Sequence, residues 1–312
     1  MNKNFKRLGI ILMLAPLIIS GAQNNESKRG DVKGPFFGQD PPGEIPVKFR
    51  FELVENEPNT HSAPVFSPDG KQVYITIMGD GPNKIKYSEM DENFIWSPLE
   101  ETAFSSKYTD SNPFLSFDGS RLYFKSYRPF QGQGQNALWV TDKTSKGWSA
   151  PELVDRIFIH PGLAWQSSIS KKGTIFFPIE SADDIDIFSS ESINGAYAKP
   201  VNLGPNVNSG VPDWQPCVAP DESYLIFASN KRTGGLGWGD LYVSFKEKDG
   251  TWGKAVNLGT KINTPENEEW PALSPDGKYL FFRRCEYSNN YKWYYMWVGT
   301  KIIDELKPDH LK

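Results

Sequence analysis

The chain has 312 residues, of which 14% are aromatic and ten are tryptophan, enough for a sizeable core. Its formal net charge is −4 and no basic tract runs along it, so nucleic acid is not an expected partner. The sequence lacks a Walker loop, a dinucleotide fingerprint and a His/Cys cluster at zinc spacing, so we expect neither a cofactor nor a metal.

Residues 1–22 have the three parts of a signal peptide. A basic start is followed by an apolar run over residues 8–19, and Ser20-Gly21-Ala22 supplies the small residues that a signal peptidase needs. The apolar run is shorter than the roughly 20 residues of a spanning helix. We therefore expect cleavage, no stable membrane span afterwards and a periplasmic or secreted protein, with an uncleaved anchor as the alternative. The polar, Gly- and Pro-rich residues 23–45 predict a loose leader.

From residue 46 to residue 312 the chain reads as one domain built on a repeated β-hairpin. In the clearest copy, Pro275-Asp276-Gly277 separates two strands: Pro presets φ, Asp bonds its own backbone and Gly takes a positive φ. The five copies are residues 61–75, 110–124, 165–177, 213–227 and 268–282. Their turn residues recur every 49 to 55 residues, at Gly70, Gly119, Gly173, Glu222 and Gly277. Such a period predicts a propeller or a solenoid. The turn aspartates are expected to be turn formers and not catalysts: Asp69, Asp118, Asp221 and Asp276.

Further short strands follow each hairpin, and they favour propeller blades. Third strands are predicted at residues 85–88, 137–140, 186–189, 240–244 and 294–298. Fourth strands are predicted at residues 96–99, 148–153, 197–203 and 252–258, with prolines that suit an outer edge. The fifth unit has no fourth strand, so we expect residues 46–53 to supply it. The predicted fold is an all-β, five-bladed β-propeller with four-stranded blades closed by the N-terminal strand, and a six-bladed ring is the alternative.

The Ser-Pro-Asp-Gly-Lys turns at 67–71 and 274–278 resemble the repeat of the TolB-like, WD40-like β-propeller family of exported bacterial proteins. The Gly-rich link at 234–244 and the Asn-Leu-Gly stretch at 257–263 are similar to other parts of that repeat, and the resemblance spans residues 36–306. It implies the fold and an exported setting. Similar repeats serve as protein-docking rings, as lids on exported peptidases and as lyases acting on pectin fragments. The peptidase half is not indicated here, because the chain has no Gly-x-Ser-x-Gly elbow. TolB itself has six blades and an extra domain, and neither is evident here.

The first strands of a propeller line its channel, so the residues that begin them are expected to meet at one rim. We predict a ligand site there, made of Asn112, Trp165, Gln166, Asp213, Trp214, Gln215, Glu269 and Trp270. Indole rings stack on sugar rings while carboxylates and amides take hydroxyls, which favours a glycan; a cell-envelope protein is the other partner considered. Repeat architecture alone also places similar residues at these positions. The first hypothesis is therefore an exported, monomeric, non-catalytic propeller that binds a glycan or a protein.

The same rim leaves a second hypothesis open, a carbohydrate-active enzyme, and the sequence does not decide between them. The candidate catalytic residues are His61, Asp110, Asp213, Glu268, Arg283 and Arg284. Their carboxylates suit the acid pair of a glycoside hydrolase. Their imidazole and guanidinium groups, together with Tyr127-Arg128, suit the base and the charge neutraliser of a polysaccharide lyase. A hydrogen-bonded turn residue is the simpler role for His61.

The two cysteines, Cys217 and Cys285, fall in neighbouring repeats. Export permits a disulfide, but one cysteine lies within a first strand and the other just past a second, so their Cβ atoms need not meet. We expect buried free thiols, with a disulfide as the alternative.

Overall fold

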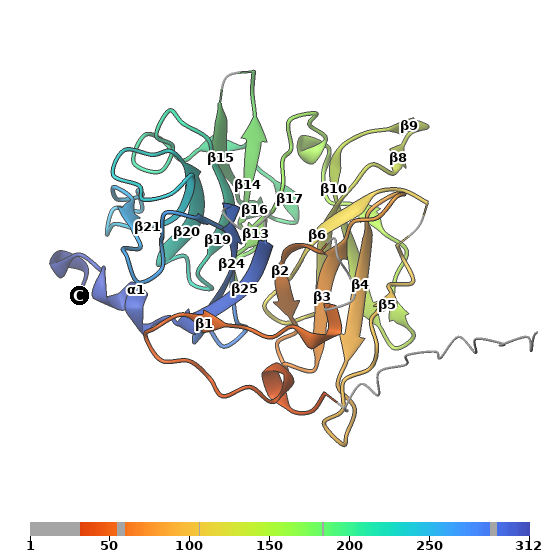
Figure 1. The fold of residues 1–312 in the computed structure, drawn as a ribbon. Coiled ribbons are helices and arrows are strands. Elements are labelled where there is room, and N and C mark those ends of the chain that lie inside the picture. Colours follow the sequence, from red (N-terminus) through yellow and green to blue (C-terminus); the bar gives the residue numbers. More distant parts are fainter. Residues whose placement is uncertain (1–31, 55–59, 106, 183, 288–291) are drawn as a thin grey trace, which may run out of the picture. The chain divides into compact units, whose positions relative to one another are not determined.

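The computed structural model describes residues 32–54, 60–105, 107–182, 184–287 and 292–312 (Figure 1). The predicted signal peptide, residues 1–22, lies outside the described residues. The described helices are short: η1 (Pro35–Gly38), η2 (Glu52–Val54), η3 (Arg156–Phe158), α1 (Lys301–Glu305) and η5 (Asp309–Leu311). None of these helices is long and apolar enough to cross a membrane. Strands are far more extensive than helices, and the all-β prediction is confirmed.

The strands assemble into five antiparallel groups, numbered 1 to 5 in chain order, and each group contains one of the predicted hairpins. Group 1 consists of β2 (Thr60–Phe66), β3 (Gln72–Ile77), β4 (Lys84–Glu89) and β5 (Glu100–Glu101). Group 2 consists of β6 (Asp110–Leu115), β7 (Arg121–Ser126), β10 (Ala137–Thr144), β11 (Gly147–Trp148) and β12 (Glu152–Leu153). Group 3 consists of β13 (Ser168–Ile169), β14 (Ile175–Glu180), β15 (Ile185–Ser190) and β18 (Val201–Asn202). Group 4 consists of β19 (Asp213–Val218), β20 (Tyr224–Asn230), β21 (Gly239–Phe245) and β22 (Val256–Asn257). Group 5 consists of β23 (Asn267–Leu273), β24 (Tyr279–Glu286), β25 (Lys292–Gly299) and β1 (Val47–Lys48).

Two features stand outside this simple pattern. A single parallel bridge between Gly239 and Asn267 joins groups 4 and 5 into one eight-stranded sheet. Two small hairpins extend from groups 2 and 3: β8 (Pro129–Phe130) with β9 (Gln133–Gly134), and β16 (Ser192–Ile193) with β17 (Ala196–Tyr197).

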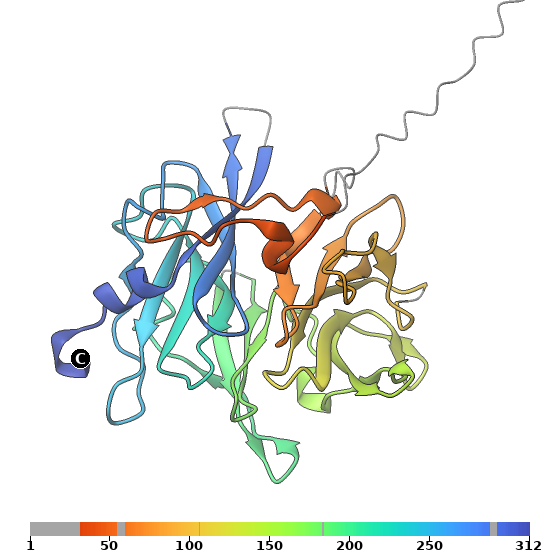
Figure 2. The ribbon, with the colours of Figure 1, turned by 90° about the horizontal axis from the view of Figure 1, so that it is seen from below.

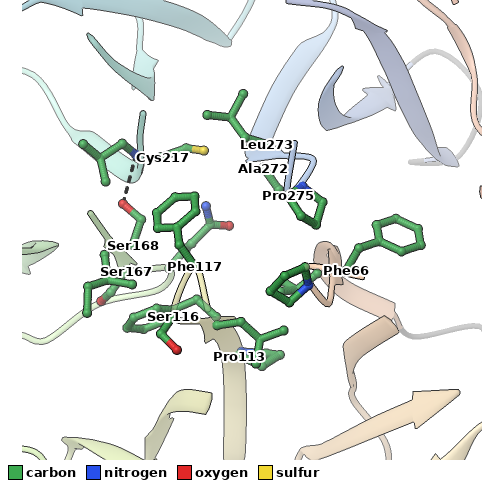
Figure 3. A pocket seen from close by; sticks show the side chains of 17 residues that line it. Phe66, Pro113, Ser116, Phe117, Ser167, Ser168, Cys217, Ala272, Leu273 and Pro275 are labelled. Atoms are coloured by element: carbon green, nitrogen blue, oxygen red, sulfur yellow. Dashed lines mark hydrogen bonds between the residues drawn. The ribbon is translucent and has the colours of Figure 1, made fainter. Parts of the chain in front are cut away.

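The first strands of the five groups pack against one another in chain order. β2 contacts β6, β6 contacts β13, β13 contacts β19, β19 contacts β23, and β23 in turn contacts β2. Their hairpin ends surround an apolar cavity of about 100 Å³, called the hairpin-end cavity below. Figure 3 shows Phe66, Pro113, Cys217 and Leu273 placed around this cavity, and they belong to four different groups. The first strands therefore form the centre around which the groups are arranged.

The hairpin turns form as the Pro-Asp-Gly pattern predicts. Ser67 Oγ donates to Asp69 Oδ1 at 2.6 Å, and Ser274 Oγ donates to Asp276 Oδ1 at 2.7 Å. The glycine that follows has a positive φ in both turns, 68° at Gly70 and 72° at the equivalent position of group 5. These aspartates hold turns, which confirms the role predicted for them.

Group 4 has Glu222 where the other turns have glycine, with a φ of 65°. The Glu222 carboxylate accepts hydrogen bonds from Ser170 Oγ at 2.7 Å, Thr174 Oγ1 at 2.8 Å and Lys246 Nζ at 2.6 Å. Burial alone would raise the pKa of this carboxyl, but these hydrogen bonds and the Lys246 charge lower it to about 2. Glu222 therefore ties the turn of group 4 to the turn of group 3 by a buried polar contact.

The predicted fourth strand of group 1, residues 96–99, is wrong in its position. The paired segment is Glu100–Glu101, which lies opposite Tyr87 and Lys86. Trp96 is instead buried in the core, where its indole N–H donates to the carbonyl of Gly34 at 2.8 Å. Pro98 also has no N–H to give to a ladder. The other three predicted fourth strands contain β12, β18 and β22, each only two residues long.

The N-terminal strand pairs with the last hairpin, as the repeat count predicts. Val47 lies opposite Trp297 of β25, and Figure 2 shows the N-terminal segment alongside the last strands. The strand is shorter than the predicted residues 46–53, because Phe49 and Phe51 turn into an aromatic cluster. Residues 32–45 belong to the predicted loose leader, but they bury Phe37, which stacks on Phe51 at 5.2 Å between ring centroids. Aromatic burial therefore fixes this part of the leader.

Candidate ligand-binding site

A cavity of about 380 Å³ lies where the first strands begin, and five indole rings line it. Its lining residues are Thr60, His61, Met78, Trp165, Trp214, Gln215, Trp238, Glu269, Trp270, Arg283 and Trp293. We call it the tryptophan cavity. Half of the ten tryptophans in the chain meet here, although they come from groups 3, 4 and 5 and from the segments between strands. Such a concentration of flat apolar faces beside a few polar groups is typical of a small-molecule site.

An irregularity in the first strands directs several of these side chains. The ladder register shifts between Trp214 and Cys217 in group 4 and between Glu269 and Ala272 in group 5. Gln215 lies inside the first of these bulges with a φ of 55°. The same left-handed backbone occurs at Ser62, Asn112, Trp165 and Trp270 in the other groups, with φ between 24° and 73°. A β-bulge re-aims the side chain of its extra residue, and left-handed non-glycine residues tend to cluster at functional sites.

The indole rings differ in depth. Trp214 and Trp270 are only 7% and 3% exposed, whereas Trp238 and Trp293 are 44% and 37% exposed. Trp165 lies against Trp214, with ring centroids 5.4 Å apart. The cavity therefore has a buried aromatic floor and an exposed aromatic rim, which allows stacking on a ligand at two levels.

Three polar atoms of this cavity have no hydrogen-bond partner among the described residues. They are His61 Nδ1, Trp214 Nε1 and Arg283 Nε. Each of these atoms is buried, and an unsatisfied buried donor or acceptor costs free energy that a ligand can recover. The wall of the cavity therefore contains two N–H donors and one ring nitrogen whose hydrogen bonds the described residues leave unmade.

Burial also perturbs the titrating groups of the cavity. Burial and the nearby Arg283 charge lower the pKa of His61 to about 4, so its imidazole is neutral at physiological pH. Burial raises the pKa of Glu269 and lowers that of Arg283. His61 packs edge-on against Trp270, with ring centroids 4.3 Å apart, which fixes the imidazole in an aromatic setting.

Most of the predicted catalytic residues lie elsewhere, in buried ion pairs within single groups. Asp110 accepts from Arg128 at 2.8 Å in group 2, and Asp213 lies 3.4 Å from Arg232 in group 4. In group 5, Glu268 accepts from Arg284 Nε at 2.6 Å and from Thr264 Oγ1 at 2.7 Å. The three acids, Asp110, Asp213 and Glu268, are fully buried and do not line the tryptophan cavity. Of the six catalytic candidates, the structure brings only His61 and Arg283 to it.

The predicted ligand residues divide in the same way. Trp165, Trp214, Gln215, Glu269 and Trp270 line the tryptophan cavity. Gln166 instead lines the hairpin-end cavity, and its side chain donates to the carbonyl of Pro271 at 2.7 Å. Asn112 is buried outside both cavities, and its backbone N–H donates to Thr76 Oγ1 at 2.9 Å. Gln166 and Asn112 therefore connect groups, and Asn112 also lies behind the cavity wall, where its side chain acts on His61.

Sequence reasoning missed the two rim tryptophans. Trp238 lies in the Gly-rich segment 234–239, which reads as a plain loop, and Trp293 belongs to β25, one residue before the predicted third strand begins. A large aromatic residue inside a glycine-rich loop has no core to fill, so Trp238 carried a signal that was available from the sequence.

Within the described ranges, no three His, Cys, Asp or Glu side chains gather to hold a metal ion. Cys217 and Cys285 are free and buried, as predicted. Burial raises the pKa of the Cys217 thiol to about 12, so it is not a reactive thiolate.

No family model and no curated protein sequence matches this chain. Among solved structures it is similar to an arabinanase from Bacillus subtilis, at 12% identity and a TM-score of 0.52 over 78% of this chain and 95% of that chain. It is also similar to TolB from Acinetobacter baumannii, at 13% identity and a TM-score of 0.50 over 76% of this chain and 53% of that one. A TolB from Agrobacterium tumefaciens gives 19% identity and a TM-score of 0.49, over 72% of this chain and 69% of that one. At such identities the similarity concerns the fold alone, and the fold is that of a TolB-like β-propeller.

Proposed function

We propose that this protein is an exported, five-bladed β-propeller that binds a glycan through the tryptophan cavity without catalysing a reaction on it. The observation that carries the proposal is that five indole rings line one cavity. Among the described residues, a single carboxylate, that of Glu269, lines the same cavity. The faces of sugar rings are apolar and their edges are hydroxyl groups. The indole faces and the unpartnered polar atoms of this cavity match both features.

The five-bladed ring is supported by the packing of the first strands. β23 contacts β2 directly, so no sixth first strand separates groups 5 and 1. The pairing of β1 with β25 gives group 5 the fourth strand that it otherwise lacks. A six-bladed ring would need another first strand between two of the groups, and the direct contacts between the described first strands favour five.

Binding is favoured over hydrolysis because the acids are in the wrong places. A glycoside hydrolase needs two carboxyl groups on the ligand, roughly 5 to 9.5 Å apart. Glu269 lines the cavity, whereas Asp110, Asp213 and Glu268 are engaged by arginines. The lyase alternative needs a general base with a pKa near the working pH, and a pKa of about 4 makes His61 a weak base.

A protein partner remains the alternative ligand, because repeat propellers also dock proteins through this kind of surface. The export proposal rests on the basic start, apolar run and small residues of 1–22. Fractionation of cells that express the full chain tests it: the mature protein is expected in the periplasm or the medium, with its N-terminus near residue 23. A full-length protein retained with the membrane would contradict it.

Titration of the intrinsic tryptophan fluorescence with a panel of soluble oligosaccharides tests the glycan proposal. We expect saturable quenching by at least one oligosaccharide, and a loss of affinity of tenfold or more in Trp214→Ala. Trp252→Phe is the matched control, because Trp252 packs on Phe176 in the core and does not line the cavity. Affinity that is unchanged in Trp214→Ala would remove the cavity from the binding site. Release of new reducing ends or of unsaturated products during the titration would make the protein an enzyme.

A further inference from the structure

Arg283 differs from the other arginines at the ends of the second strands. Arg128, Arg232 and Arg284 each pair with a buried carboxylate of their own group, at 2.8, 3.4 and 2.6 Å. In the part of the chain that the structure describes, Arg283 has no ion pair and its Nε has no acceptor. The side chain is nonetheless 95% buried, since only 5% of its surface is exposed.

The surroundings of Arg283 hold its guanidinium in place without neutralising it. Its guanidinium carbon lies 4.3 Å from the centroid of the Trp293 ring and 5.7 Å from that of Tyr295. Burial lowers the pKa of Arg283, which records the cost of keeping this charge out of water. Stacking on aromatic faces recovers part of that cost, but the N–H groups still need an acceptor.

Glu269 lies opposite Arg283 on β23 and β24, and its charge acts on the guanidinium. The two side chains form no ion pair within 4.0 Å, and burial raises the pKa of Glu269. His61 adds no charge to the cavity, because its pKa is lowered to about 4 and the imidazole is neutral at physiological pH. The cavity thus holds a buried cation whose neutralisation by its neighbours is incomplete.

We propose that the glycan bound in the tryptophan cavity is an acidic saccharide, whose carboxylate accepts hydrogen bonds from Arg283. This inference rests on the proposed glycan-binding function and specifies its ligand class. A planar guanidinium matches a carboxylate in shape and donor spacing, and the bond between them is charge-assisted. A carboxylate would pair with the unpaired charge of Arg283, and a neutral sugar has no charged group that can do so.

The test compares sugars that differ in one group. Oligosaccharides of β-1,4-glucose, β-1,4-mannose and α-1,4-galactose are titrated beside their uronate forms, in which a carboxylate replaces the C6 hydroxymethyl group. We expect at least one uronate to bind at least tenfold more tightly than its neutral counterpart. Equal affinity within the pairs that bind overturns the acidic-ligand inference and leaves the glycan proposal standing. Absence of binding by every member overturns the glycan proposal itself.

Three variants assign the preference to Arg283. Arg283→Gln is expected to bring the ratio of acidic to neutral affinity close to one, while the neutral sugar loses less than threefold. Arg283→Lys keeps the charge but loses the planar fork, so part of the preference should remain. Lys231→Gln is the matched control, because Lys231 is an exposed cation beside the cavity, 5.9 Å from the Trp238 ring centroid. Its ratio should stay within twofold of the parent protein.

Salt and sulfate distinguish the buried contact from general attraction. A preference that comes from the buried Arg283 should persist in 0.5 M NaCl, where exposed charges are screened within roughly 4 Å. A preference that disappears in salt, or one that survives in Arg283→Gln, contradicts the assignment. Sulfated sugars of the same three backbones form a further arm of the test. Tighter binding of the sulfated sugar than of the uronate would contradict the proposal that the acidic group of the ligand is a carboxylate. Thermal melting of each variant shows whether it is folded.

Discussion

Gln215 Oε1 accepts a hydrogen bond at 2.8 Å from the backbone N–H of Trp270, and this contact joins the first strands of groups 4 and 5. Both residues have a left-handed backbone, with φ of 55° and 59°, and both line the tryptophan cavity. Left-handed non-glycine residues cost of order 1–3 kcal/mol each and persist only where their surroundings hold them. The hydrogen bond between these two bulges is such a restraint, and it makes the shape of the cavity depend on the packing of the two groups.

Replacing Gln215 by methionine should therefore affect both stability and binding. The Trp270 N–H loses its buried acceptor, which costs about 1–3 kcal/mol in the free energy of unfolding. Glycan affinity should fall as well, because Trp270 is no longer held in place. Urea denaturation and fluorescence titration measure the two effects. Gln131→Met is the control, since Gln131 is exposed and also has a positive φ, 52°. A binding loss of the same size in both variants would argue against a specific role for the contact.

The exposed tryptophans of the rim should set how long a glycan the cavity prefers. Trp238→Ala and Trp293→Ala each remove a stacking surface outside the buried floor. We expect either change to weaken binding of tri- and tetrasaccharides by about 2- to 10-fold, the size of a lost aromatic contact, with a smaller effect on a disaccharide. Isothermal titration with a size series checks this. An equal loss at every chain length would mean that the rim does not contact the added sugar units.

Glu222 should make the stability of the protein sensitive to acid. Its folded pKa is about 2, below the ordinary value of 4.5, so its stabilising contribution is complete above pH 4.5 and is lost as the pH falls toward 2. Glu222→Gln should lower the free energy of unfolding by roughly 2 kcal/mol at pH 7 and by little near pH 2. Urea denaturation at both pH values measures this difference. Glu101→Gln, at an exposed position, is the control and should change stability by less than about 0.5 kcal/mol at either pH. A pH-independent loss in Glu222→Gln would assign the effect to packing.

Arg284 and Glu268 should behave as a structural pair. Arg284→Met leaves the fully buried Glu268 without its partner and should destabilise the fold by about 3–5 kcal/mol. The double variant Glu268→Met/Arg284→Met should regain most of that loss, because no uncompensated charge remains. Urea denaturation of the single and double variants gives the coupling energy. If Glu268→Gln left stability unchanged and abolished a measurable turnover of glycan, Glu268 would be catalytic after all.

Phe49 tests the connection between the N-terminal segment and group 5. Its ring lies 5.1 Å from Phe281 and 5.2 Å from Trp297, measured between centroids. Phe49→Ala should destabilise the protein by about 3–5 kcal/mol and speed hydrogen exchange first in β24 and β25. Phe94→Ala is the control, because the Phe94 side chain is 56% exposed. Equal exchange across all five groups in Phe49→Ala would mean that the N-terminal segment stabilises the whole unit at once.

The repeat and its turns could be predicted because their causes are local. Pro275-Asp276-Gly277 contains its own conformational preferences, and the five hairpins appear where the pattern predicts them. The fourth strands were harder, since a two-residue strand such as Glu100–Glu101 has no periodic pattern of its own. Its position depends on Trp96, which is buried against Gly34, more than sixty residues away in the sequence.

The sequence determined the five-fold repeat of hairpins, the all-β content and the concentration of tryptophan near the starts of the first strands. Only the tertiary structure decided which of those residues share a cavity. Glu268 and Glu269 are adjacent in the sequence, yet Glu268 pairs with Arg284 of its own group whereas Glu269 faces the cavity. The bulges explain why: the residue before a proline normally favours an extended backbone, but Gln215 and Trp270 adopt the left-handed one. Packing between groups imposes this left-handed backbone, and no local sequence pattern predicts that packing.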